Sequence, residues 1–262
     1  MRYVTKKFDS VGKYLHYLNT TPTNDVFKNQ NLASQATNKP YWSGTNTYSD
    51  ADDLLRYGDK ELFAKVRAQL AKNKVTGTGE SSKRQYYSDV CGFVPHVSNF
   101  VQGLPNNMIN KRVVRYKNSK VVTIIYNTGV DCSIDVDNVI KVSIQVMNFV
   151  AGLESKGYRV NLYTMNIART KNELASSIVR IKQSEDYTDR LKLVYPMVHP
   201  SMTRRQMLRF VEVCDIKDVN FISDYGSPIA KADEVKRILN EQGVKYDYYF
   251  DYYEVSKNGI NI

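Results

Sequence analysis

The feature that most constrains the fold is an apolar run, VVTIIY, followed by a long amphipathic segment and a second apolar run. VVTIIY occupies residues 121–126, and a polar turn follows it. A helix is predicted over about 136–156, because apolar residues recur on one face and Gly157 ends the pattern. YRVNLYTMNI (158–167) is typical of a strand. The apolar face of the helix consists of Val139, Val142, Val146, Phe149 and Leu153.

The same alternation continues towards the C-terminus. Further strands are predicted at 176–183, 219–226 and 244–255, and further helices at 189–198, 199–213 and 231–243. The apolar density of 189–198 would also suit a strand. Strands that alternate with helices of this length predict an α/β fold with an open, largely parallel sheet flanked by helices, either Rossmann-like or von Willebrand A-like.

The first part of the chain has a mixed pattern. Helices are predicted at 9–19, 48–58 and 59–74, and loops at 20–40 and 76–85. Two strand-like runs on either side of Asn118 and Ser119 predict a hairpin or strand pair over 111–126. We therefore expect a basic region of helices and loops at 1–110 and an α/β sheet domain at 111–262.

Several function classes lack a sequence signal. The three cysteines, Cys91, Cys132 and Cys214, form no CxxC pair, which predicts free thiols in a reducing cytoplasm and no zinc ribbon. No apolar signal segment follows Met1, and the apolar runs are too short to cross a bilayer, so we expect no membrane association. Because no GxSxG, P-loop, GxGxxG or HExxH motif is present, we expect neither an enzyme nor a bound cofactor.

The positive charge is concentrated in the first part of the chain. The net charge is +10, from 37 Lys and Arg against 27 Asp and Glu. Residues 1–120 contain 19 basic and 9 acidic side chains, whereas residues 121–262 contain 18 of each. This segregation favours a polyanionic partner, although an inert basic surface would have the same composition.

A run of basic residues, KRVVRYKNSK, lies directly before the apolar run VVTIIY. A basic strand that carries an aromatic ring is typical of a groove for single-stranded nucleic acid, where cations neutralise phosphates and rings stack on bases. The alternative is an edge strand that Lys and Arg protect from aggregation. The candidate contacts in this run are Lys111, Arg112, Arg115, Tyr116, Lys117 and Lys120, joined by Lys72, Lys74, Lys83 and Arg84 from the preceding helix and loop.

Trp42, the only tryptophan, lies in the polar segment YWSGT. Its ring is a further candidate for stacking on a base. A lone tryptophan also commonly anchors a loop to the core, and both hypotheses stay open here.

Asp131, Ser133 and Asp135 form a D-x-S-x-D pattern after the first predicted strand of the sheet. Von Willebrand A-type sites use D-x-S-x-S at this place, and oxygen ligands suit Mg²⁺. The third position departs from that pattern. Ser133 or Asp135 as the N-cap of the following helix is the alternative.

The segment YDYYFDYYEV (246–255) alternates between two faces. The first, with Tyr246, Tyr248, Phe250 and Tyr252, is expected in the core. The second face is acidic and aromatic, and we expect it to bind a protein partner or simply to face solvent. Its candidate partner contacts are Tyr249, Asp251 and Tyr253.

Four stretches together resemble a family of bacteriophage-encoded proteins. They are YWSGTNTYSDADDLLRYG (41–58), GFVPHVSNFVQGLPNNM (92–108), DVDNVIKVSIQVMNFVAGLESKGYRVNLY (135–163) and HPSMTRRQMLRFVEV (199–213). The resemblance covers most of the chain and implies an α/β C-terminal half, but no reaction. Size and basic character are also similar to those of a phage middle-transcription activator that binds single-stranded DNA and recruits the phage RNA polymerase.

The function that we expect is therefore a phage protein that binds single-stranded DNA, or RNA, and recruits a polymerase in the cytoplasm of the host. The alternative is a von Willebrand-like protein-interaction module without nucleic-acid binding.

Overall fold

A five-stranded sheet forms the centre of the protein. The computed structural model describes residues 2–37, 40–72, 84–113, 120–131, 133–219 and 231–260. The strands, in the order in which they lie side by side, are β1 (Arg2–Phe8), β7 (Glu173–Lys182), β6 (Arg159–Arg169), β5 (Val121–Asn127) and β8 (Tyr248–Asp251). Of the four neighbouring pairs that these described strands form, three are parallel and one, β6 with β7, is antiparallel. The predicted open, largely parallel α/β sheet is confirmed.

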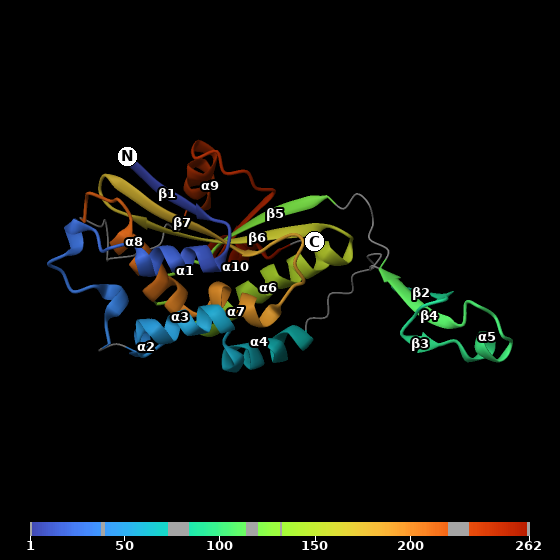
Figure 1. Cartoon of the computed structure of the whole chain (residues 1–262). Coiled ribbons are helices and arrows are strands. Elements are labelled where there is room, and N and C mark those ends of the chain that lie inside the picture. The colour runs from blue at the N-terminus through green and yellow to red at the C-terminus, as the bar shows by residue number, and fades with distance from the viewer. Residues whose placement is uncertain are drawn as a thin grey trace.

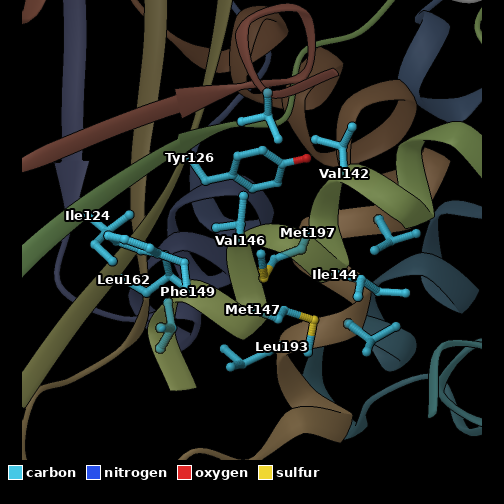
Figure 2. Packing of buried hydrophobic residues seen from close by; sticks show 14 of the residues in the cluster. Ile124, Tyr126, Val142, Ile144, Val146, Met147, Phe149, Leu162, Leu193 and Met197 are labelled. Carbon is cyan, nitrogen blue, oxygen red and sulfur yellow. The ribbon is translucent and has the colours of Figure 1, made fainter. Parts of the chain in front are cut away.

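The connection between β5 and β6 is the long helix α6 (Val136–Ser155), as its apolar period predicts. All five residues of the predicted helix face are buried. Figure 2 shows three of them, Val142, Val146 and Phe149, packed with Ile124 and Tyr126 of β5 and Leu162 of β6. The hydroxyl of Tyr126 lies 3.0 Å from Oγ of Ser143, so the buried ring keeps a polar partner. Burial of each large apolar side chain stabilises the fold by about 1.5–3 kcal/mol, so this layer contributes much of the stability.

Residues before 111 contribute to the same sheet and to its covering helices. β1 pairs in parallel with β7, and Phe8 lies opposite Val179. The sheet therefore contains residues from both sides of the expected boundary at 111. The elements that follow β1 are α1 (Val11–Thr20), η1 (Asp25–Phe27), η2 (Ala33–Gln35), α2 (Pro40–Ser43), α3 (Tyr48–Tyr57) and α4 (Lys60–Lys72).

The described helices between β7 and β8 complete both layers. They are α7 (Arg190–Val198), the π-helical segment η3 (Met202–Met207), α8 (Leu208–Val213) and α9 (Ala232–Glu241). The helix predicted for 189–198 is confirmed, whereas the one predicted for 199–213 contains the π-helical segment. In Figure 1, α1, α3, α6 and α7 lie on one side of the sheet and α9 on the other. The strand predicted for 219–226 lies outside the described residues, apart from Val219. Among the described helices, none has the length and apolar character needed to span a membrane.

A second, three-stranded sheet contains β2 (Arg84–Asp89), β4 (Met108–Val113) and β3 (Val94–Pro95), and the short helix α5 (Val97–Val101) follows β3. Figure 1 shows this small sheet apart from the larger one. The predicted strand pair over 111–126 is wrong, because β4 pairs with β2 and β3 whereas β5 pairs with β6 and β8. The apolar run of β5 is buried between neighbours on both edges, which a hairpin with a basic strand would not provide.

The last strand ends earlier than predicted. β8 stops at Asp251, and α10 (Tyr252–Asn258) begins there. The Asp251 carboxylate accepts a hydrogen bond of 2.7 Å from the backbone N–H of Glu254, which is the geometry of an N-cap. This local hydrogen bond competes with strand pairing and ends the strand.

Candidate nucleic-acid interface

The central strand of the small sheet brings aromatic and basic residues onto one face. β2 and β4 are antiparallel, with Tyr86 directly opposite Lys111 and Ser88 opposite Ile109. Val94 of β3 also lies opposite Ile109. Side chains directly opposite one another project from the same face of a sheet. Tyr86 and Lys111 are therefore neighbours on one face.

Phe93 joins them on this face. Its ring centroid lies 6.2 Å from that of Tyr86, and Nζ of Lys111 lies 5.2 Å from the Phe93 centroid. Tyr86 is 60% exposed and Phe93 is 54% exposed. We call Tyr86, Phe93 and Lys111 the ring face. It combines two accessible π surfaces with one cation, which are the groups that hold bases and phosphates of a single strand.

Gly92 allows this arrangement. A Cβ on Gly92 would lie 2.2 Å from the carbonyl oxygen of Ile109, so a side chain there would push β3 away from β4. The backbone N–H of Phe93 donates a 3.0 Å hydrogen bond to the same carbonyl. The close approach of the two backbones therefore places the Phe93 ring beside Lys111. The sequence analysis did not identify Phe93 as a candidate contact. The available signal was the glycine directly before this aromatic residue, in the segment that precedes the basic strand.

The end of the small sheet is apolar and uncharged. No Asp, Glu, Lys or Arg occurs between Val90 and Asn110. In α5, the side chains of Val97, Phe100 and Val101 are all more than two-thirds exposed. Clustered exposed apolar groups are typical of surfaces that contact another molecule.

The predicted cationic contacts are distributed over several elements. Lys111 and Arg112 are in β4, Arg84 is in β2, and Lys72 is the last residue of α4. Lys120 is exposed and directly precedes β5. The structure thus brings Arg84, Lys111 and Arg112 into one sheet with Tyr86. Five predicted contacts lie outside the described residues: Lys74, Lys83, Arg115, Tyr116 and Lys117.

Trp42 is in α2, away from the small sheet. The guanidinium carbon of Arg204 lies 5.3 Å from the Trp42 ring centroid, and Nη1 of Arg204 donates a hydrogen bond to the Trp42 carbonyl. The ring is half-buried against η3. These contacts favour the anchoring alternative over stacking on a base.

The neighbouring Arg205 is fully buried. Its Nε lies 2.7 Å from Oγ1 of Thr45, and its Nη1 lies 2.9 Å from the carbonyl of Ser34. Its Nη2 lies 2.7 Å from the carbonyl of Thr45. Arg205 therefore holds the polar segment after α1 against η3 and offers no group to a phosphate.

The D-x-S-x-D residues stabilise the turn before α6. Oδ1 of Asp131 accepts a 2.9 Å hydrogen bond from the backbone N–H of Ser133, and the hydroxyl of Tyr253 accepts one from the N–H of Asp131. The Asp135 side chain accepts from the N–H of Asp137 as the N-cap of α6, which was the alternative to a metal ligand. Over the described part of the chain, no group of three or more His, Cys, Asp or Glu residues has a metal-binding arrangement.

The predicted exposed face of the last strand is buried. Tyr249 is 6% exposed and Asp251 is 2% exposed. Tyr249 packs with Val235 and Ile238 of α9, which covers this side of the sheet. Burial raises the pKa of the Asp251 carboxyl. Exposure of Tyr249 and Asp251 to a partner was therefore predicted wrongly, and Tyr253 is half-buried in α10.

Comparisons with known proteins add a family but no activity. A family model with the description "Domain of unknown function (DUF7192)" matches residues 2–261. Neither the search of curated proteins nor that of solved structures found a match.

Proposed function

The chain belongs to the DUF7192 family, and from its own residues we propose that it binds single-stranded nucleic acid, in the first place DNA. The observation that carries this proposal is the ring face. Two exposed aromatic rings lie within 6.2 Å of each other, and an exposed lysine lies 5.2 Å from one of them. Bases of any sequence can stack on such rings, while the ammonium group neutralises a neighbouring phosphate.

Local charge supports this choice. Residues 81–130 contain seven Lys and Arg residues and one acid, Asp89. The Asp89 carboxylate accepts a 2.7 Å hydrogen bond from the backbone N–H of Val90, so it is engaged within its own turn. A polyanion therefore meets an almost uniformly positive segment. Duplex DNA has no exposed base faces, so it would use the cations but not the rings.

The uncharged surface of α5 supports a second function, the docking of a protein. Val97, Phe100 and Val101 present apolar side chains without a charged residue nearby in sequence. Apolar patches of this kind are typical of protein interfaces. For this surface we propose a polymerase as partner, in keeping with the phage resemblance.

Fluorescence anisotropy tests the primary proposal. Labelled single-stranded DNA, single-stranded RNA and duplex DNA of equal length are titrated with the full chain over a series of salt concentrations. We expect the single strands to bind more tightly than the duplex, with affinity falling as salt rises because counterions are released. Absence of binding at low salt, or equal affinity for duplex and single strand, would contradict the proposal.

A further inference from the structure

A cavity of about 400 Å³ lies at the carboxyl ends of β1 and β7, far from the ring face in sequence. These two strands are parallel, with Phe8 opposite Val179, so Asp9 and Arg180 lie side by side where the strands end. The backbone from Ser10 to Gly12 lines one wall. In open α/β sheets, ligands bind outside the carboxyl ends of strands.

Three cationic side chains from three different elements line this cavity: Arg56 of α3, Arg180 of β7 and Lys192 of α7. Nε of Arg180 donates a 2.8 Å hydrogen bond to the carbonyl of Asp9, which leaves both Nη groups of its guanidinium for a ligand. The side chains of Arg56 and Lys192 make no hydrogen bond or ion pair among the described residues. The backbone N–H of Lys192 donates to Oδ1 of Asp189, and Arg56 interacts electrostatically with Asp52. Three cationic side chains gathered in one cavity favour an anionic ligand.

Two of the other charged residues of the cavity, Asp9 and Lys182, already have ionic partners. Asp9 forms an ion pair with Lys13 at 3.1 Å. The buried Lys182 is paired with Glu154 at 2.7 Å and donates to the carbonyls of Val160 and Asp186. The exposed side chain of Asp186 is the remaining acid. The cavity thus has three cationic side chains, Arg56, Arg180 and Lys192, for this one acid. Its net positive charge favours an anionic ligand.

Apolar side chains form the rest of the wall. Leu15 and Leu55 are buried, and Ile181 is half-buried beside Arg180. A volume of about 400 Å³ is within the range of small-molecule sites, which combine apolar walls with a few convergent polar groups. We propose that this cavity binds a phosphate monoester, with the phosphate held by Arg56, Arg180 and Lys192 and the organic part against Leu15 and Leu55. A nucleoside monophosphate has both parts, whereas inorganic phosphate has only the anionic group.

Isothermal titration calorimetry of the full chain tests the site. The probes are inorganic phosphate, adenosine monophosphate and unphosphorylated adenosine, at low ionic strength, with chloride at equal ionic strength as the reference. Binding of both phosphates but not of adenosine supports an anion site. Tighter binding of the monophosphate than of inorganic phosphate supports a monoester whose organic part contacts Leu15 and Leu55, and equal binding would contradict that contact.

The decisive variant is Arg56→Ala/Lys192→Ala. We expect it to bind phosphate at least about tenfold more weakly, because a hydrogen bond to a charged group is worth about this much. Both side chains are exposed, so the fold should persist, which circular dichroism checks. The matched control is Lys65→Ala/Arg67→Ala, which removes one lysine and one arginine from exposed positions of α4. Unchanged affinity in Arg56→Ala/Lys192→Ala, or no phosphate binding by the wild type, overturns the proposal.

A second variant separates this site from the ring face. Tyr86→Ala/Phe93→Ala should leave phosphate binding unchanged, since the cavity contains no residue of the small sheet. Loss of phosphate binding in this variant alone would place the ligand on the ring face and overturn the cavity site. The result is independent of whether single strands bind.

Discussion

The ammonium nitrogen of Lys111 lies 5.2 Å from the centroid of the Phe93 ring, although 18 positions separate the two residues in the sequence. This distance is within the range of a cation–π contact. It places a cationic group beside an exposed aromatic ring. Phe93 directly precedes β3, and the pairing of β3 with β4 brings it beside Lys111.

The first prediction concerns the two rings. Tyr86→Ala/Phe93→Ala should weaken binding of single-stranded DNA by about tenfold to a hundredfold, since a stacked base contributes about 1–3 kcal/mol. Anisotropy at a single low salt concentration measures the change. The control is Tyr187→Ala, which removes a tyrosine that is 93% exposed between β7 and α7, and this variant should bind normally. Equal losses in both variants would show that the ring face has no special role.

The second prediction concerns the cation. Lys111→Gln should reduce the slope of log affinity against log salt by about 0.7, the value for one phosphate contact on a single strand. Affinity should fall by a similar factor for every sequence tested, because phosphate contacts carry no sequence information. Lys171→Gln, at an exposed turn between β6 and β7, should keep the wild-type slope. An unchanged slope for Lys111→Gln would remove this residue from the interface.

The third prediction concerns stability. Arg205→Met should lower the free energy of unfolding by at least about 3 kcal/mol, because several buried carbonyl and hydroxyl groups lose their donor together. Urea denaturation followed by circular dichroism measures the loss. Arg67→Met, at an exposed position of α4, should change stability by no more than about 0.5 kcal/mol. Similar effects of the two substitutions would contradict a holding role for Arg205.

The fourth prediction concerns His199, which stacks on Tyr195 with 4.7 Å between ring centroids. Burial lowers the pKa of His199 from 6.5 to about 4. Between these two pKa values the unfolded chain binds a proton that the folded chain does not, so stability falls as pH decreases from 6.5 to about 4. The slope of this contribution is at most about 1.4 kcal/mol per pH unit.

His199→Gln keeps an acceptor for the backbone N–H of Ser201, which donates to Nδ1 of His199 at 3.1 Å. Thermal unfolding of both proteins across this pH window gives the comparison. The variant should lose less stability than the wild type on acidification. Parallel curves would show that His199 titrates normally in the folded protein.

The fifth prediction concerns Asp52, whose Oδ2 accepts a 2.6 Å hydrogen bond from Asn19. Burial raises the pKa of the Asp52 carboxyl. Because the pKa of this carboxyl is higher in the folded protein than in the unfolded chain, the protonated carboxyl favours folding at low pH. That contribution to the free energy of unfolding is lost as pH rises through the folded-state pKa. Asp52→Asn should therefore stabilise the protein at neutral pH, with a smaller gain in acid. The exposed neighbour Asp53→Asn is the control and should show no such pH-dependent gain in thermal unfolding.

Local patterns in the sequence predicted most helices correctly. α6 begins and ends within one residue of its predicted bounds, because its apolar period and the Asp135 cap act within a few residues. α9 ends at Glu241, shortly before Gly243, which has φ 64°. Such signals need no knowledge of distant neighbours, since helix hydrogen bonds and caps are local.

Strand partners and strand faces were less predictable. β8 alternates between two faces that both carry aromatic rings, so the pattern alone does not say which is covered. α9 decides this by packing on Tyr249 and leaving Tyr248 exposed. In the same way, KRVVRYKNSK was correctly predicted to begin in a strand, but its neighbours β2 and β3 could not be known from its composition.

The sequence by itself determined the α/β class, the positions of the helices and the concentration of positive charge before residue 121, since each depends on local order or on a simple count. Only the tertiary structure decided that β4 and β5 belong to different sheets and that Arg205 is buried. It alone brought Phe93 beside Lys111 and gathered Arg56, Arg180 and Lys192 around one cavity. The physical reason is that strand pairing and burial depend on contacts between distant segments, and many partners satisfy the same local pattern equally well.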